Sequence, residues 1–471
     1  MTGTLLIPVE NQVRELDAKL LLAAVAVQRG FACVVGSRTE LDFRLGRFPR
    51  GVYLSKSMTR HSRKVFSILR QLGHEIVVWD EESLVTYADP RIYHARRLAP
   101  ESLAFVSHLF AWGEADAELF RKYPAYAGTP IDVTGNPRGD LLRPELRPYF
   151  ERAAEACRRE HGDFLLVNTN FGQVNAFYPT MNLLEPPDPE GARGLGRGAV
   201  GMTRDYAEGR AAHKRALLES FLEMIPRLAD AFPAQNVVVR PHPVENPSVY
   251  RELAARHPRV HVVTDGGSPV PWLLAARALV HNCCTTGLEA WMLGKPAVAY
   301  RPVRDPSYEE SLPNELSHDA GDLAELVSVL RRVVAGELGR KEGEAERRLL
   351  EQHVAGGSGP FACDHIVAAV ERIEAARRDA RPPALRVRAE GHWRTLRRRV
   401  KKWTQARKPD SKNRSEFQRH RYPGITAEEV RERLGRFQEL LGLDAPARVS
   451  RVCAHVYRIE RRAAGGSPTA R

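Results

Sequence analysis

Segments typical of strands and helices alternate along the first 335 residues, and this alternation limits the possible folds more than any other feature. Short apolar runs predict buried strands, and the segments between them carry apolar residues every three or four positions, as amphipathic helices do. Strands separated by helices form parallel sheets with helices on both faces. The first series of expected strands is Thr4–Val9, Phe31–Gly36, Val52–Leu54, Glu75–Trp79, Leu109–Trp112 and Ile131–Thr134. The sequence therefore predicts the α/β class.

The alternation begins again after residues 143–158, which we expect to form a connector. The second series of expected strands is Phe164–Thr169, Asn236–Arg240, Val260–Thr264, Ala278–His281 and Ala297–Tyr300. Residues 172–210 interrupt it and predict a substrate loop or lid. Two doubly wound units in tandem resemble the GT-B glycosyltransferase architecture, in which two Rossmann-type domains face a cleft. We expect domains at 1–150 and 151–375, followed by a basic helical extension at 376–471.

The basic charge of the chain is concentrated in that extension. The formal net charge is +13, and residues 394–421 contain twelve Lys or Arg against two acids. Trp393, Trp403 and Phe417 lie in or beside this stretch. It could bind nucleic acid, lie on an anionic membrane or grip a lipid-linked acceptor, or be a solvated tail. We favour contact of 394–421 with the inner leaflet and expect no nucleic-acid partner.

The remaining composition indicates an ordinary globular protein. The apolar run Leu20–Val27 is too short to cross a bilayer, and the N-terminus lacks the basic start of a signal peptide. The six cysteines show no metal-ligand or disulfide spacing, which favours reduced thiols. We therefore expect a cytoplasmic protein that is at most peripheral on the inner face of the plasma membrane.

The first candidate site follows a predicted strand at Arg240-Pro-His-Pro-Val-Glu245. In parallel sheets, ligands bind beyond the carboxyl ends of the strands. Two prolines fix the backbone there, so His242 projects from a rigid turn beside Arg240. Both side chains can donate hydrogen bonds to a phosphate. The alternative is a proline-rich turn with a solvated histidine.

The second candidate site is the start of a predicted helix at Thr285-Thr286-Gly287. Amides at a helix N-terminus, together with the threonine hydroxyls, bind phosphate groups. Glu289 lies one turn further and could accept hydrogen bonds from ribose hydroxyls. It could equally complete a capping box with Thr286.

Three further segments carry polar residues at predicted strand ends. Asn136 and Arg138 follow the last strand of the first series, where a plain turn is the alternative and Asp140 could anchor Arg138. Glu10 ends the first strand, with Arg14 four residues later, and a carboxylate there could be a general base. Asn170 ends the first strand of the second series.

Together these segments resemble the bacterial surface carbohydrate biosynthesis protein family, which is similar to capsule Kdo transferases and CDP-glycerol glycerophosphotransferases. The resemblance covers most of residues 1–335 and rests on Pro8–Asp17, Phe110–Glu114, Val133–Asp140, Arg240–Glu245 and Thr285–Pro296. It implies that His242 contacts the donor phosphate of a cytidine nucleotide. It also implies that Thr285, Thr286 and Glu289 hold the rest of the CMP- or CDP-linked donor.

The resulting hypothesis is transfer of a sugar from a nucleotide donor on 151–375 to a polysaccharide or lipid-linked acceptor on 1–150. Glu10 would be the base, while His242 and Arg240 would stabilise the leaving group, with Asn170 and Glu245 completing the donor site. Arg14, Asn136 and Arg138 would face the acceptor. No Asp-x-Asp motif is present, so we expect no metal and no cofactor besides the donor substrate.

Two other functions fit the same pattern. A nucleotide-sugar epimerase uses the same two-domain layout and also carries a turn like Thr134–Asn136. A non-catalytic protein could bind glycan or nucleotide as an assembly factor. An epimerase would work without an acceptor, which separates it from a transferase.

Overall fold

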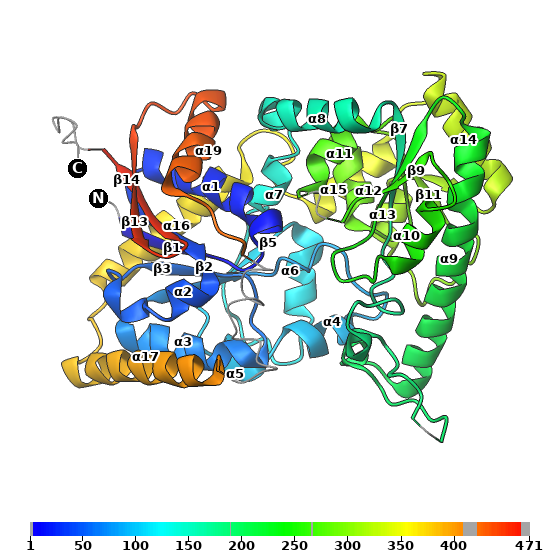
Figure 1. Ribbon diagram of the computed structural model, residues 1–471. Coiled ribbons are helices and arrows are strands. Elements are labelled where there is room, and N and C mark those ends of the chain that lie inside the picture. Colours follow the sequence, from blue (N-terminus) through cyan, green and yellow to red (C-terminus); the bar gives the residue numbers. More distant parts are fainter. Residues whose placement is uncertain (1–2, 189, 265–266, 408–421, 463–471) are drawn as a thin grey trace. The chain divides into compact units, whose positions relative to one another are not determined.

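The computed structural model describes residues 3–188, 190–264, 267–407 and 422–462 (Figure 1). The chain forms two compact units, each built on its own sheet. The first comprises residues 1–81, 97–141 and 352–471, and the second comprises 82–96 and 142–351. These ranges differ from the predicted domains: residues 352–375 and the extension belong to the first unit, and residues 82–96 and 142–150 belong to the second.

The sheet of the first unit has eight strands in the order β13-β14-β2-β1-β3-β4-β5-β6, of which β1 to β6 run parallel. Strand β1 is buried along almost its whole length, which explains its continuous apolar sequence. The strands are β1 (Gly3–Val9), β2 (Phe31–Ser37), β3 (Val52–Ser55), β4 (Glu75–Trp79), β5 (His108–Ala111), β6 (Ile131–Val133), β13 (Ala447–Cys453) and β14 (Val456–Arg461).

A C-terminal hairpin extends this sheet, although the extension is predicted to be helical throughout. Strand β14 pairs antiparallel with β2 beside the start of the chain (Figure 1). Gly36 permits this close approach, because a Cβ there would lie 2.1 Å from the backbone oxygen of His455. The hairpin therefore covers an edge that the first strands would leave open.

Helices cover the first sheet, as the alternation of strand and helix patterns predicts. In α1, Asn11 is the N-cap, and its side chain accepts a hydrogen bond from the Arg14 amide. The helices of this unit are α1 (Gln12–Gln28), α2 (Arg38–Asp42), α3 (Arg63–Leu72), α5 (Pro100–Leu103), α6 (Glu114–Arg121), α7 (Pro137–Asp140), α16 (Ala362–Asp379), α17 (Leu385–Gln405) and α19 (Ala427–Leu440), with short 3₁₀ helices η1 (Leu45–Arg47) and η2 (Arg60–Ser62). Residues 408–421 of the predicted basic stretch lie outside the described residues.

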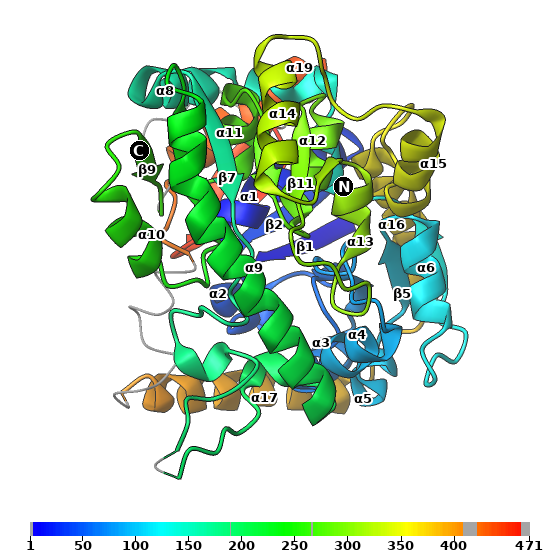
Figure 2. The same cartoon turned by 90° about the vertical axis from the view of Figure 1, so that its right-hand side faces the viewer.

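The second unit contains a six-stranded parallel sheet in the order β12-β11-β10-β7-β8-β9. Helices α9 and α14 lie on one face, and α11 and α12 on the other (Figures 1 and 2). The strands are β7 (Phe164–Asn168), β8 (Asn236–Arg240), β9 (Val260–Val262), β10 (Leu279–His281), β11 (Ala297–Tyr300) and β12 (His318–Ala320). The helices are α4 (Pro90–Arg97, whose last residue lies in the first unit), α8 (Glu151–His161), α9 (Arg204–Ala231), α10 (Ser248–Ala254), α11 (Pro269–Ala275), α12 (Thr285–Met292), α13 (Ser311–Glu315), α14 (Leu323–Val334) and α15 (Glu344–His353, at the junction), with 3₁₀ helices η3 (Pro144–Tyr149), η4 (Pro179–Met181) and η5 (Arg197–Ala199).

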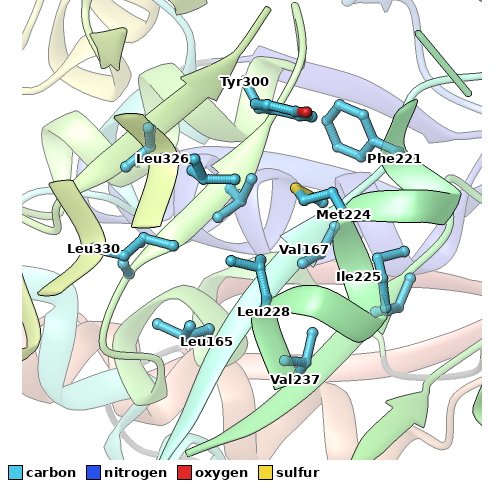
Figure 3. Close-up of a cluster of buried hydrophobic side chains, with 14 of the residues drawn as sticks. Leu165, Val167, Phe221, Met224, Ile225, Leu228, Val237, Tyr300, Leu326 and Leu330 are labelled. Atoms are coloured by element: carbon cyan, nitrogen blue, oxygen red, sulfur yellow. The ribbon is translucent and has the colours of Figure 1, made fainter. Parts of the chain in front are cut away.

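In the second unit, apolar side chains from the strands and from the helices pack into one core. Leu165 and Val167 of β7 face Leu228 of α9 and Leu330 of α14 in one buried cluster (Figure 3). Burying one such side chain stabilises the fold by about 1.5–3 kcal/mol. Each strand and each helix must therefore place its apolar residues on the side that faces this core. The spacing of apolar residues in the sequence reflects this requirement.

The structure adds local detail to two segments of the second unit. The expected connector at 143–158 is helical, because η3 and α8 occupy it. The segment 172–210, expected to be a substrate loop or lid, also contains ordered structure. Helix α9 begins within it at Arg204, and Leu183, Leu184 and Ala199 form a small core against that helix. The two leucines therefore form a small core in a segment whose overall composition is polar.

Candidate active site

Residues predicted to bind the donor lie at the carboxyl ends of three neighbouring strands of the second unit. Strand β7 pairs with β8 on one side and with β10 on the other. Asn170 follows β7, His242 follows β8 and Thr285 follows β10. The elements predicted from separate parts of the sequence therefore share one edge of the sheet.

Glu245 ties the loops after β7 and β8 together. Its buried carboxylate accepts hydrogen bonds from the amides of Phe171 (3.0 Å) and His242 (3.1 Å) and from the hydroxyls of Thr169 (2.9 Å) and Tyr250 (2.6 Å). Burial raises the pKa of Glu245, and these hydrogen bonds act in the opposite direction. Because its oxygens are engaged inside the protein, Glu245 acts in the site as a positioning residue for the His242 turn.

The tautomer of His242 follows from its backbone contact. Its Nδ1 accepts a hydrogen bond from the Val244 amide at 3.3 Å. A neutral imidazole that accepts at Nδ1 carries its proton on Nε2. His242 is half-buried, and in this tautomer its Nε2 is a hydrogen-bond donor.

Arg240 brings a half-buried positive charge to the same strand end. Its Nη2 donates to the backbone oxygen of Gly267 (2.9 Å), and its guanidinium lies 5.6 Å from the Trp272 ring centre. Its Nε has no hydrogen-bond partner among the described residues. Burial lowers the pKa of Arg240 to about 10, while the nearby carboxylate of Glu289 acts against this effect. Arg240 and Glu289, predicted separately, thus lie within electrostatic reach of each other.

The turn before α12 is held from two sides. Cys283 adopts a left-handed backbone conformation (φ +48°), which is uncommon outside glycine. Its amide donates to Asn314 Oδ1 (3.0 Å), and its carbonyl accepts from Asn170 Nδ2 (3.2 Å). Asn170 therefore fixes the turn that leads into the helix start.

Helix α12 begins two residues earlier than a capping box between Thr286 and Glu289 would require. Its N-cap is Cys284, whose side chain makes no cap hydrogen bond, and Thr286 lies inside the helix. The Thr286 hydroxyl donates to the Cys284 sulfur at 3.1 Å. The capping-box interpretation of Glu289 is therefore wrong. Half-buried Thr285 and the helix amides form the positive end of the α12 dipole.

Gly287 has a packing role that is independent of any ligand. A Cβ at this position would lie 2.5 Å from the ring of His281, which is buried and bonded through Nε2 to Ser317 Oγ at 2.8 Å. Burial lowers the pKa of His281 to about 3, so this ring is neutral. The glycine thus lets α12 pack against the end of β10.

We expect Gly287→Ala to lower the free energy of unfolding by about 1–3 kcal/mol, because the methyl group overpacks this contact. Chemical denaturation measures the change. Gly435→Ala is the matched control, since Gly435 lies in α19 with nothing within 4 Å of an added Cβ. Alanine there should stabilise by about 0.5–1 kcal/mol. An equal response of the two variants would contradict the packing role.

A buried pair of cations beside this edge was not predicted. Arg210 and Lys214 of α9 share the carboxylate of Glu310: Arg210 Nη2 contacts it directly, and Lys214 Nζ lies 3.7 Å from Oε2. Burial raises the pKa of Glu310, but the two cations outweigh burial and hold it below the usual value. The charge of Lys214 also reaches the Cys283 thiol. Their spacing of four residues places both on one helix face, but it does not show that this face is buried against Glu310.

In the first unit, a chain of ion pairs follows the carboxyl ends of the strands. Each neighbouring pair in it is 2.7–3.8 Å apart. In order, this ion-pair chain contains Arg38, Glu10, Lys56, Glu15, Lys19, Glu81 and Arg138. It connects two regions that the sequence marked separately, around Glu10 and around Arg138.

Glu10 contacts cations from two other elements. Its Oε2 lies 2.8 Å from Arg38 Nη1 and 3.1 Å from Lys56 Nζ. Arg14, expected beside it, lies in the first turn of α1 and donates its amide to Asn11. The two cations stabilise the deprotonated carboxylate of Glu10, which a general base needs, but they also weaken its affinity for a proton.

Glu15 and Lys19 form the buried centre of the ion-pair chain. The Glu15 carboxylate accepts from the amides of Glu10 (2.9 Å) and Asn11 (3.2 Å), and Lys19 Nζ also donates to the backbone oxygen of Pro8 (2.7 Å). Burial raises the pKa of Glu15, but Lys19 and Lys56 outweigh it and hold this pKa far below its usual range. These residues fix Glu10 at the end of β1.

Asn136 and Arg138 lie at the start of α7. Asn136 is the N-cap and accepts from the Arg138 amide at 3.0 Å, while the guanidinium of Arg138 lies 3.8 Å from Glu81. Asp140 also holds a second helix. Its two oxygens accept from the amides of Ala362 and Cys363 (2.8 Å each) at the start of α16. Asp140 thus joins α7 to a helix more than 200 residues away in the sequence.

The described residues contain no group of three His, Cys, Asp or Glu side chains placed to hold a metal ion. Among the same residues, no helix has both the length and the apolarity to cross a bilayer.

The fold is α/β and GT-B-like, with two Rossmann-type units, as the sequence predicts. A solved structure of the wall teichoic acid polymerase TagF, soaked with CDPG, is similar to 80% of this chain over 89% of its own length, with 9% identity and a TM-score of 0.50. The UDP-GlcNAc 2-epimerase of Methanocaldococcus jannaschii, in complex with UDP-GlcNAc and UDP, covers 78% of this chain over 99% of its own, with 12% identity and a TM-score of 0.46. At these identities the likeness concerns the fold. No protein-family model and no curated protein matches the sequence.

Proposed function

We propose that the second unit binds a nucleotide-activated donor and that the chain transfers its sugar to a surface polysaccharide or lipid-linked acceptor. The main support is the geometry at the ends of β7, β8 and β10. There the Nε2 proton of His242, the charge of Arg240 and the start of α12 lie at one sheet edge. Hydrogen-bond donors and positive charges of this kind bind phosphate oxygens.

In the proposed reaction, an acceptor hydroxyl attacks the anomeric carbon and the nucleotide leaves with its phosphate. His242 and Arg240 stabilise the negative charge that develops on the leaving oxygen, together with the helix dipole at Thr285 and Thr286. Glu245 keeps the His242 turn in place, and Glu289 is a candidate for the ribose hydroxyls. In the proposed reaction these groups stabilise the leaving phosphate without a metal ion.

The first unit is proposed to hold the acceptor. Glu10 would remove the hydroxyl proton, and Arg14, Asn136 and Arg138 would bind the acceptor sugar. The same arrangement could transfer a polyol phosphate, in which case the attacked atom is phosphorus. A cytidine donor is the first choice, because the sequence resembles cytidine-dependent enzymes and because TagF, of similar fold, was soaked with CDPG.

A nucleotide panel tests the donor proposal on the intact chain. We expect CMP or CDP to raise the melting temperature more than UDP does, because the donor site selects the base. Turnover then separates the candidate functions. Nucleotide released only when a saccharide acceptor is present indicates a transferase, and an isomerised sugar without acceptor indicates an epimerase. Binding of nucleotide without any turnover would contradict the enzymatic proposal.

A further inference from the structure

Helix α17 is attached to the first unit by one of its faces. It runs along α3 in both views (Figures 1 and 2). Gly391 allows close contact with Leu72, at 3.2 Å from an added Cβ, and Arg394 donates to Ser67 and Gln71 at 2.9 Å. Arg398 donates to the backbone oxygen of Asp42 at 3.2 Å. The helix is therefore held in a defined orientation.

A different face of α17 carries a row of large apolar side chains in solvent. We call this row the α17 stripe. Its members are Leu385, Trp393, Leu396, Val400 and Trp403, which are 52–79% exposed. The spacing of three and four residues from Trp393 to Trp403 places them on one side of the helix. A contiguous row of exposed apolar side chains marks an interaction surface.

Exposed basic residues flank the stripe. Arg397 and Lys401 lie along one side of the helix and Arg399 along the other. The guanidinium of Arg407 lies 3.6 Å from the ring centre of Trp403. An apolar stripe with basic margins matches a surface whose interior is apolar and whose outer layer is anionic.

We propose that the α17 stripe docks on an anionic lipid bilayer, with its apolar side chains among the acyl chains and its basic residues at the phosphate level. A second copy fits less well, because a two-fold contact would bring the same basic margins together. Nucleic acid also fits less well, because Leu385, Leu396 and Val400 can neither stack on bases nor contact phosphates. This inference does not depend on the proposed transfer reaction.

Tryptophan quenching by brominated lipids tests the docking directly on the full chain. The chain has six tryptophans, and only Trp393 and Trp403 are exposed, whereas Trp79, Trp112, Trp272 and Trp291 are buried. We expect vesicles of phosphatidylglycerol and brominated phosphatidylcholine to quench the fluorescence of these two residues. Binding should weaken as salt rises, because salt screens the basic margins.

Vesicle flotation with variants supplies the second measurement. Changing Trp393, Leu396, Val400 and Trp403 together to Ser should reduce partitioning onto anionic vesicles by at least about tenfold. The control changes Phe177 and Tyr178 to Ser, which are equally exposed aromatic residues in the second unit, and it should float like the original chain. The double variant with Arg397→Gln and Lys401→Gln removes two basic residues beside the stripe. It should bind anionic vesicles more weakly than the control double variant with Arg152→Gln and Arg332→Gln.

Three results would overturn the proposal. The original chain could fail to bind anionic vesicles, the stripe variant could float as well as the original, or quenching could be absent in vesicle-bound protein. Retention of an oligonucleotide in place of vesicles would assign the basic face of α17 to nucleic acid instead. The quenching arm uses the unaltered chain, so a folding defect in the stripe variant cannot decide the outcome.

Discussion

Replacing His242 with Ala is expected to reduce donor turnover by about a hundred- to ten-thousandfold. The variant removes the Nε2 donor that the Val244 contact sets, while the Glu245 carboxylate still accepts the backbone amide of residue 242. The loop should therefore keep its shape, and the loss should fall on the chemical step. Release of nucleotide at saturating donor and acceptor measures it.

The control for this variant is His257→Ala. His257 lies in the same unit, beyond α10, and is half-buried like His242. We expect its turnover to match that of the original chain. Glu245→Gln should have a smaller effect than His242→Ala, and one that a folding measurement also detects, since Glu245 acts through the turn. Unchanged turnover of His242→Ala would remove the residue on which the proposed reaction depends.

Replacing Lys19 with Met should lower the free energy of unfolding by about 3–5 kcal/mol. The change leaves Glu15 and Glu81 with one cation fewer in buried surroundings, and it removes the 2.7 Å contact to Pro8 at the end of β1. That loss is a large fraction of the stability of an ordinary domain. Denaturant unfolding measures it.

A double variant separates the buried charge from the lost packing. In Lys19→Met with Glu15→Leu, no Glu15 carboxylate remains to be compensated, so we expect recovery of part of the loss. Lys122→Met is the surface control and should change stability by less than about 0.5 kcal/mol. If Lys19→Met were as mild as this control, the ion-pair chain would not stabilise the first unit.

The contacts of Glu15 also predict how the free energy of unfolding depends on pH. Because the pKa of Glu15 is far below its usual value in the folded chain, its stabilising contribution is complete above the unfolded value of about 4.3. It is lost progressively as the pH falls below that value. The slope of stability against pH in this acid range should be shallower in the Lys19→Met variant, whose Glu15 has lost one of its two cations.

The proposed donor site shows how much can be predicted from the positions of strand ends in the sequence. A predicted strand at Asn236–Arg240 matches β8, and the polar residues after it necessarily lie at the edge where parallel strands end. Position at a strand end is a local property, so His242 and Thr285 could be named in advance. Glu245 and Asn170 could be named as well, but their contacts with Phe171 and Cys283 could not, because these hydrogen bonds join loops that follow different strands.

The burial and pairing of charged residues could not be predicted in this way. Lys19 lies in a helix next to the apolar run that begins at Leu20, and Lys214 lies in the middle of α9. Nothing in their immediate neighbours shows that each is buried against a carboxylate. Such a pairing depends on which helix face meets which strand end.

By itself the sequence determined the two strand–helix series, the GT-B-like class and the position of the Pro-His-Pro turn. These features follow from periodicity, proline geometry and chain direction, all of which act over a few residues. Only the tertiary structure decided that β14 pairs with β2, that Asp140 holds the start of α16 and that the ion-pair chain reaches from Arg38 to Arg138. Those contacts join residues up to about 420 positions apart, and their energies depend on packing geometry that short sequence windows do not contain.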